Sequence, residues 1–172
     1  IGDIIESFQR LSGLNKSLSL LSKIENKQFI SKEKLSFDEI LNRIAQDFTD
    51  YAEFQKIKIT YLKEDDWIVS MNKNLAEMLV MNLIKNAIIH NQKNQGEVII
   101  RLTKSYFTIE NTSNLPQIQA DNLFKRFNKN SNNKNSTGLG LAIVKAIVDA
   151  SDLSVTYSYA GKHIFKVSSK TF

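Results

Sequence analysis

The segment NLIKNAIIHN, residues 82–91, contains the most informative pattern of the sequence. It completes an otherwise apolar helical pattern over residues 75–90 and places Asn82, Asn86 and His90 at steps of four residues, hence on one face. Such a stripe of amides is either a solvated face or a binding face. In the second interpretation an amide oxygen offers Mg2+ a neutral ligand, while the ion keeps most of its waters and takes its other ligands from phosphates.

A second motif, STGLGLAIVKAIVDASD at residues 136–152, joins a polar loop to an apolar helix predicted over residues 139–150. Gly138 and Gly140 lie at this junction, where a residue without a side chain lets the backbone approach a ligand closely. The free amides at the start of the helix then face an anion. Glycine near a helix start can also simply permit a turn. The motif therefore indicates a binding site only in combination with the asparagine stripe.

A third motif, NLFKRF, lies inside a long loop predicted over residues 112–137. A loop of this length is typical of a lid or a binding loop. The motif either supplies apolar anchors beside Arg126, a cation that suits a phosphate, or is a small helix that packs on the domain. We expect Phe124 and Phe127 to anchor the base of the loop and residues 128–136 to be poorly held.

The rest of the pattern predicts an α+β fold. Ser36, followed by Glu39, is a capping box that starts a helix. Helices are predicted over residues 37–53, 75–90 and 139–150, and strands over residues 57–62, 67–71, 98–103, 107–110, 153–159 and 164–168. This order is not the strict alternation of a doubly wound parallel sheet. It favours a two-layer sandwich of a mixed β-sheet with helices on one face.

A long amphipathic helix is predicted over residues 1–25, where apolar residues recur at steps of three and four. We expect its apolar stripe to pack on another chain or on an upstream segment, the alternative being a helix that folds back on its own domain. The polar stretch NKQFISKEKL then places a boundary near residues 29–35. The predicted division is a helix over residues 1–30 and a domain over residues 31–172.

Composition excludes several classes of protein. The chain of 172 residues is 42% hydrophobic and 24% charged, as in one globular domain, and it begins with Ile1, as expected of a fragment. It holds no apolar run long enough for a membrane helix and no signal-peptide layout. The lack of cysteine excludes disulfides, thiolate metal sites and cysteine nucleophiles, and only two histidines argue against structural zinc. The net charge of +5 is scattered, which suits a nucleotide better than nucleic acid.

In order along the chain, NLIKNAIIHN, IENTSNLP, LFKRF and STGLGLAIVK resemble the signature boxes of the catalytic, ATP-binding domain of bacterial sensor histidine kinases. The resemblance covers about residues 35–168. The upstream helix, which ends in LSKIENKQF, is similar to the second helix of the hairpin for dimerisation and histidine phosphotransfer in the same family.

The resemblance implies that ATP and Mg2+ bind between the helix of Asn86 and the loop that ends at Gly138, and that the intact protein transfers the γ-phosphate to a histidine. That histidine is expected upstream of Ile1, since neither His90 nor His163 stands in a His-Glu or His-Asp motif. The phosphate would pass to the receiver domain of a response regulator. The resemblance further implies a homodimer through the hairpin, a cytoplasmic location for this chain, a membrane anchor only in upstream segments, and no nucleic acid partner.

Residue roles follow from the same resemblance. Asn86 would hold the metal, Asn82 would lie near the phosphates, His90 would contact the nucleotide, and Arg126 is the candidate catalytic cation. The implied nucleotide-binding residues are Asn82, Asn86, His90, Asn111, Ser113, Phe124, Lys129, Thr137, Gly138, Leu139, Gly140 and Leu141.

Three positions depart from the family pattern. Asn111 replaces an aspartate that accepts a hydrogen bond from the adenine amino group, although an asparagine oxygen can accept the same bond. Ser113 replaces a glycine, and Ile89 replaces a lysine that contacts phosphate. Arg126, Lys129 or Lys134 could substitute for that lysine.

Two alternatives remain at this point. The related hydrolases place a glutamate, as general base for water, where this chain has Asn82, so an ATP-hydrolysing clamp is disfavoured. A degenerate, non-catalytic module for nucleotide binding or dimerisation is the other alternative, and it is motivated by Asn111, Ser113 and Ile89.

Overall fold

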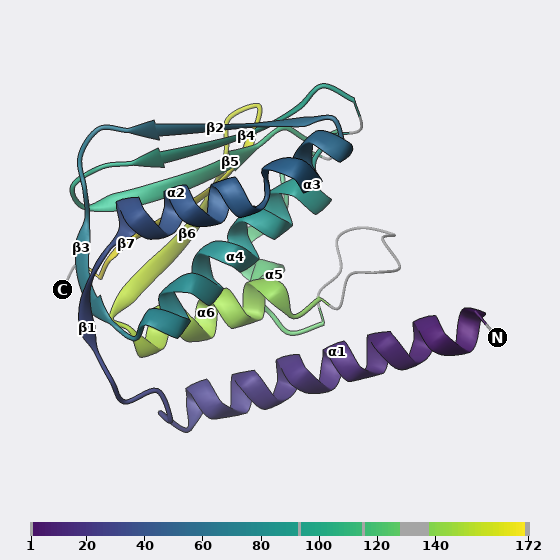
Figure 1. The fold of residues 1–172 in the computed structure, drawn as a ribbon, viewed down its shortest axis with the longest axis horizontal. Coiled ribbons are helices and arrows are strands. Elements are labelled where there is room, and N and C mark those ends of the chain that lie inside the picture. The colour runs from purple at the N-terminus through teal and green to yellow at the C-terminus, as the bar shows by residue number, and fades with distance from the viewer. Residues whose placement is uncertain (1, 93, 115, 128–137, 171–172) are drawn as a thin grey trace.

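The computed structural model describes residues 2–92, 94–114, 116–127 and 138–170, and its centre is a mixed β-sheet (Figure 1). The sheet has five strands, which are β2 (Ile57–Lys63), β4 (Gly96–Leu102), β5 (Tyr106–Asn111), β6 (Leu153–Tyr159) and β7 (His163–Ser169). Their order across the sheet is β2, β4, β5, β7, β6. Strand β2 runs parallel to β4, and the other neighbouring pairs are antiparallel. Each strand agrees with its predicted range to within two residues.

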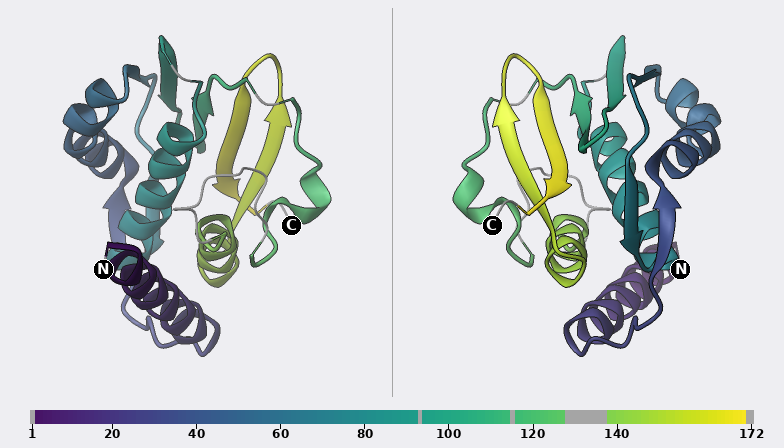
Figure 2. Two further views of the ribbon diagram at one scale, coloured as in Figure 1. Left: turned by 90° about the vertical axis from the view of Figure 1, so that its right-hand side faces the viewer. Right: turned by 90° about the vertical axis from the view of Figure 1, so that its left-hand side faces the viewer.

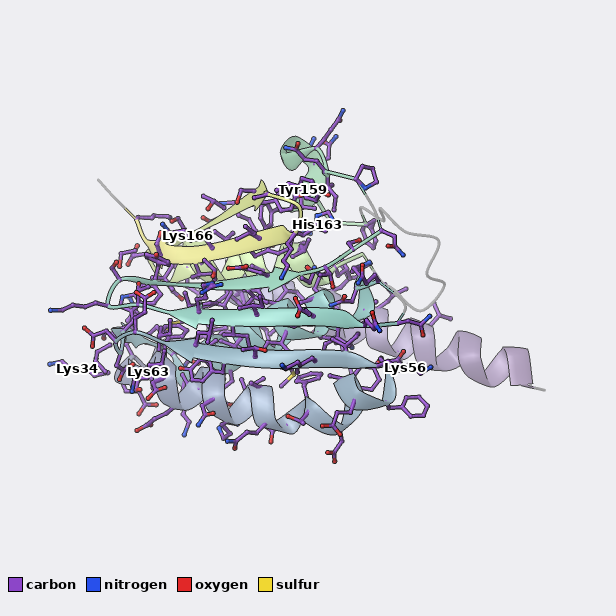
Figure 3. All side chains as sticks on the ribbon, turned by 90° about the horizontal axis from the view of Figure 1, so that it is seen from above. Lys34, Lys56, Lys63, Tyr159, His163 and Lys166 are labelled. Atoms are coloured by element: carbon purple, nitrogen blue, oxygen red, sulfur yellow. The ribbon has the colours of Figure 1, made fainter. Side chains whose placement is uncertain are left out.

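The long helices of the domain lie together on one face of this sheet (Figures 1 and 2). They are α2 (Phe37–Asp47), α4 (Lys73–Ile89) and α6 (Gly140–Ala150). Leu83 of α4, Val144 of α6 and Ile109 of β5 are fully buried in the core between the two layers. Figure 3 looks onto the opposite face, where the Lys166 ammonium lies 4.0 Å from the ring centre of Tyr106. The predicted two-layer α+β fold is confirmed.

The structure also contains a small second sheet of two strands, of which the sequence predicts only one. Strand β1 (Glu33–Ser36) pairs antiparallel with β3 (Ile68–Met71), apart from the main sheet. The sequence predicts β3 but not β1, because Glu33 and Lys34 are exposed and only Leu35 of the four residues is buried. Such a strand has no apolar alternation from which it can be recognised.

The helix predicted over residues 37–53 is two helices, α2 and α3 (Thr49–Phe54), separated at Phe48. Ser36 caps α2, since its hydroxyl oxygen accepts a hydrogen bond from the Glu39 amide at 3.2 Å. The Ser36 hydroxyl itself donates to the Asp66 carboxylate at 2.8 Å, and the same carboxylate accepts from the Asp38 amide at 3.1 Å. The serine of the predicted capping box is therefore confirmed as the cap.

The N-terminal helix α1 (Gly2–Glu25) forms as predicted, but part of its packing differs from the expectation. Leu21 and Ile24 are buried, and α1 contacts α6 of the same chain. The expectation that the stripe packs only outside the domain is wrong for these residues, whereas Leu11 is 65% exposed and Leu18 is 38% exposed. No helix in the described part of the chain is long and apolar enough to cross a membrane.

The long loop contains the short helix α5 (Ala120–Leu123). Phe124 anchors this region as predicted, with its ring edge-on to Phe165 at 6.4 Å between ring centres. The prediction for Phe127 is wrong, because this side chain is 57% exposed. Its backbone N–H instead donates to the Gly138 carbonyl at 2.9 Å. Residues 128–136, for which poor order is predicted, lie outside the described residues.

Candidate functional site

Helix α4 presents the predicted polar stripe at the border of the core. Asn72 caps the helix, since its side-chain oxygen accepts from the Leu75 amide at 3.2 Å. The apolar faces of α4 are buried, whereas Asn82, Asn86 and His90 are each half-buried. These three positions therefore form a polar edge that remains accessible beside an apolar core.

The start of α6 lies against this edge. A Cβ atom built on Gly140 would be 3.4 Å from Oδ1 of Asn82, while Nδ2 of Asn82 donates to the Met78 carbonyl at 2.8 Å. Leu139 is buried at the helix start, and Gly138 has the left-handed φ of 70° that favours glycine. The asparagine stripe and the glycine motif are thus brought together by the packing of α4 on α6.

Asn111 lies at the end of β5, where it is only 2% exposed. Asn111 lies two residues after the core residue Ile109, and successive side chains of a strand point to opposite faces, so both lie on the helix-covered side of the sheet. His163, the partner of Asn111 in the strand register, lies on the same side. Nδ2 of Asn111 donates to the Thr112 carbonyl at 3.0 Å. Ser113, which follows, is half-buried.

The two histidines of the chain are electrostatic neighbours in the fold. Burial lowers the pKa of His90, and the charge of His163 lowers it further. His163 is 3% exposed, and its Nδ1 is 2.7 Å from the Tyr157 hydroxyl, which accepts from the Ile118 amide at 3.1 Å. No local pattern of the sequence indicates that His163 lies here, because only the pairing of β5 with β7 brings it beside Asn111.

Arg126 is not placed with the asparagine stripe. Its guanidinium forms an ion pair with Glu25 at the end of α1, and both side chains are about half exposed. Leu141 of α6 and Ile89 of α4 are half-buried. Lys129, Lys134 and Thr137 lie outside the described residues.

The polar edge of α4, formed by Asn82, Asn86 and His90, could supply one ligand to a magnesium ion whose other ligands are mainly phosphate oxygens and waters. Within residues 2–92, 94–114, 116–127 and 138–170, no three histidine or acidic side chains gather as a metal site. Mg2+ does not require such a cluster when waters and phosphate oxygens supply most ligands. The half-buried amide of Asn86 provides one oxygen of the required kind.

Comparison with known proteins shows the family to which the chain belongs. The family described as histidine kinase-, DNA gyrase B- and HSP90-like ATPase matches residues 71–170, and the chain belongs to it. Within this family, the sequence and the fold of the chain are those expected of the catalytic domain of a sensor histidine kinase, as its similarity to known histidine kinases shows.

Individual relatives agree with this placement. The chain is 30% identical over 173 residues to the sensor histidine kinase HprS of Escherichia coli K12. It is 31% identical over 171 residues to the heme sensor protein HssS of Staphylococcus aureus JH9. Each alignment covers 95% of this chain but 37% of the relative, so the chain spans little more than a third of these proteins.

Solved structures give the same result. The histidine kinase AdeS of Acinetobacter baumannii superposes with a TM-score of 0.73 at 25% identity, covering 96% of this chain and 81% of that one. The cytoplasmic segment of the histidine kinase QseC has a TM-score of 0.69 at 16% identity, covering 92% and 95%, and supports the fold alone.

Proposed function

We propose that this domain binds ATP with Mg2+ between α4 and the start of α6, and that the intact protein transfers the γ-phosphoryl group to a histidine upstream of this chain. The observation that carries the proposal is the approach of Gly140 to Asn82, with 3.4 Å between a built Cβ and Oδ1. This approach places the polar stripe of α4 beside the start of α6. The stripe is suited to a hydrated cation and the helix start to an anion.

The residues divide the binding between them. Asn86 would hold Mg2+, whose chemistry is to neutralise charge on the phosphates. The free amides at the start of α6 would face the phosphates, with Asn82 beside them. At the other end of the site, the buried Asn111 offers its Oδ1 to the amino group of the base, and the half-buried His90 provides a ring for contact.

The same residues favour transfer over hydrolysis. An amide side chain at Asn82 cannot take a proton from water, so the chain lacks a general base at this point of the stripe. Transfer to a histidine depends mainly on positioning and charge neutralisation. Arg126 can assist only after it leaves Glu25, with which it pairs in this structure.

The remaining elements of the proposal concern the intact protein. Helix α1 would be half of a dimerisation hairpin, with residues 1–30 as its second helix and residues 31–172 as the catalytic domain. The receiver domain of a response regulator would accept the phosphoryl group. The chain would lie in the cytoplasm, with any membrane anchor in upstream segments, and would have no nucleic acid partner.

The test uses the full-length protein and ATP labelled in the γ-phosphate. We expect label on the protein that is stable to alkali and lost in acid, as for a phosphohistidine, and that passes to a receiver domain. Asn86→Ala should abolish labelling, whereas Asn74→Ala, an exposed asparagine in the first turn of α4, should preserve it. Steady phosphate release by the isolated domain, lost on Asn86→Ala, would indicate a hydrolase instead. A full-length protein without an acceptor histidine would favour the non-catalytic module.

A further inference from the structure

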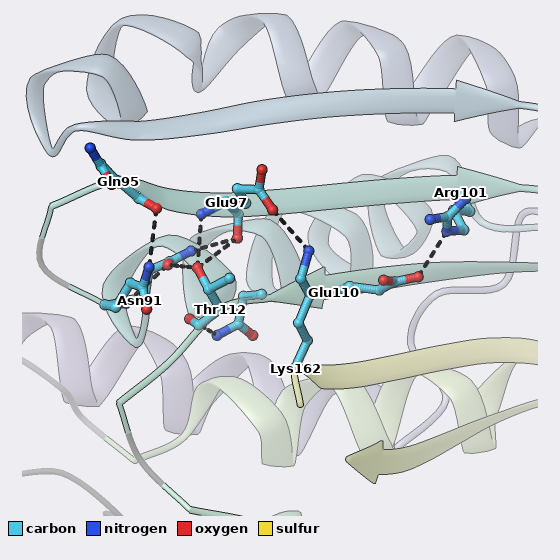
Figure 4. A network of polar contacts seen from close by, with 9 residues as sticks. Asn91, Gln95, Glu97, Arg101, Glu110, Thr112 and Lys162 are labelled. Atoms are coloured by element: carbon cyan, nitrogen blue, oxygen red, sulfur yellow. Dashed lines mark hydrogen bonds and ion pairs between the residues drawn. The ribbon is translucent and has the colours of Figure 1, made fainter. Parts of the chain in front are cut away.

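A polar network joins the end of α4 to the start of β4 and to Thr112, which follows Asn111 at the end of β5 (Figure 4). Its centre is Asn91, the residue after His90. Nδ2 of Asn91 donates to the Ala87 carbonyl at 3.1 Å and to the Glu97 carbonyl at 2.9 Å. Its Oδ1 accepts from the Thr112 hydroxyl at 2.6 Å and from the Gln92 amide at 2.9 Å. Both donors and the acceptor of this amide are therefore used, which fixes its orientation.

The backbone is adapted to this amide. A Cβ atom on Gly96 would be only 2.5 Å from Oδ1 and 2.9 Å from Cγ of Asn91, so the close approach requires glycine. The turn that leads to Gly96 holds Asn94 and Gln95 at left-handed φ angles of 68° and 52°. Such angles are costly for residues with side chains and persist where surrounding contacts impose them.

Thr112 connects the amide of Asn91 to Asn111 through hydrogen bonds. Its hydroxyl oxygen accepts from the Glu97 amide at 2.8 Å, and its own amide donates to the Glu97 carbonyl at 3.1 Å. Its carbonyl accepts from Nδ2 of Asn111 at 3.0 Å. Because Nδ2 is held in this way, the amide of Asn111 turns Oδ1, an acceptor, to its other side.

The orientation of this amide decides which base it can read. Asparagine carries a donor and an acceptor on similar branches, and rotation by half a turn exchanges them. With Oδ1 presented, the side chain accepts from an exocyclic amino group, as in adenine. With Nδ2 presented, it would donate to a carbonyl, as in hypoxanthine or guanine. An aspartate would need no such control, since both of its oxygens accept.

We propose that Asn91 and Thr112 are positioning residues that hold Asn111 in the orientation that selects a purine with an amino group at position 6 over one with a carbonyl there. The inference rests on the proposed function, because it takes the base to bind at Asn111. Neither residue needs to touch the nucleotide. Their effect is on which base is preferred, rather than on whether phosphates and metal bind.

The experiment compares the affinities of this chain for ATP and for ITP, which carries a carbonyl in place of the amino group, both with Mg2+. We expect the wild type to prefer ATP. Thr112→Val, which removes the hydroxyl at nearly constant shape, should lower the ratio of the two affinities by roughly two- to tenfold, the value of one hydrogen bond. Thr112→Ser, which keeps the hydroxyl, should keep the wild-type ratio.

Two further variants separate positioning from general damage. Thr108→Val makes the same change in β5, the strand that ends just before Thr112, at a residue 8% exposed whose hydroxyl lies outside the network, and should keep the wild-type ratio. Asn91→Ala removes the other partner and should lower the ratio as Thr112→Val does. The double variant should lose no more than either single variant, since both changes break one link. If Thr112→Val fails to fold, Asn91→Ala carries the test.

The outcomes distinguish the inference from the proposed function. A Thr112→Val chain that folds and keeps the full ATP preference overturns the inference, whatever its absolute affinity. A wild type that binds ATP and ITP equally also overturns it, while nucleotide binding stands. A wild type that binds neither nucleotide overturns the proposed function and the inference together.

Discussion

Oδ1 of Asn82 lies 3.4 Å from the position that a Cβ atom would take on Gly140. The two residues come from different motifs, one in the middle of α4 and one at the first position of α6. Their proximity shows that the packing of α4 on α6 brings the two motifs side by side. The structure gives different reasons for the two glycines of the second motif, and substitution of Gly138 and Gly140 by alanine can separate them.

Gly138→Ala should destabilise the fold by about 1–2 kcal/mol, because φ at this position is 70° and an L side chain is strained there. Gly140→Ala should change the free energy of unfolding by less than about 1 kcal/mol, since its Cβ would only reach ordinary contact with Asn82. Urea unfolding of the two variants measures the difference. Equal losses at both positions would contradict this account.

Leu21→Ala should lower the free energy of unfolding by about 2–5 kcal/mol, because this side chain of α1 is 1% exposed in the core. Leu18→Ala, the same change less than one turn earlier at a residue 38% exposed, is the control and should cost much less. Thermal unfolding of both variants gives the comparison. Similar stabilities would mean that α1 does not pack on its own domain.

Glu25→Ala should raise the affinity for ATP with Mg2+, by up to about fivefold, if Arg126 serves the phosphates, because an exposed ion pair contributes about 0–1 kcal/mol. Arg126→Ala should lower the affinity. Asp149→Ala removes a carboxylate from another exposed ion pair, with Lys145, and should leave binding unchanged. Calorimetry distinguishes these cases, and unchanged binding in both Glu25→Ala and Arg126→Ala would remove Arg126 from the site.

The stability of the fold should fall on acidification through the titration of His90. Burial lowers the pKa of this ring, and the charge of His163 lowers it further, so the unfolded chain binds more protons than the folded one. The contribution is complete above about pH 6.5, decreases as the pH falls toward the folded-state pKa, and is constant below it. NMR titration of the ring should show a pKa below that of an unfolded peptide.

His90→Gln serves as the control for this pH dependence. The stability of the variant should be less sensitive to pH below about 6.5, where the unfolded histidine takes up its proton. A ring that titrates at or above the ordinary value, or a variant with an unchanged slope, would show that His90 is not desolvated in the folded chain.

Much of the fold could be predicted from the sequence, because most elements carry a clear periodicity. Strand β6 occurs at the predicted residues, and α4 and α6 differ from prediction by two residues or fewer at each end. Strand β1 was missed because its exposed residues show no alternation. The interruption of the helix at Phe48 was missed because no glycine or proline marks it.

The site was predictable only in part, for a physical reason. Local spacing shows that Asn82 and Asn86 share a face, but it contains no information on what packs against that face. The neighbourhood of His163 and Asn111 depends on the register of β5 and β7. The pairing of Arg126 with Glu25 joins residues 101 positions apart, which no local pattern can indicate.

If ATP and Mg2+ bind together at Asn86, this should be visible in a calorimetric titration of this chain with a non-hydrolysable ATP analogue, with and without Mg2+. We expect binding that is strengthened by Mg2+ in the wild type and in Asn74→Ala, and a loss of the Mg2+-dependent part in Asn86→Ala. Absence of binding at millimolar nucleotide, or an Asn86→Ala chain that responds to Mg2+ as the wild type does, would contradict this expectation.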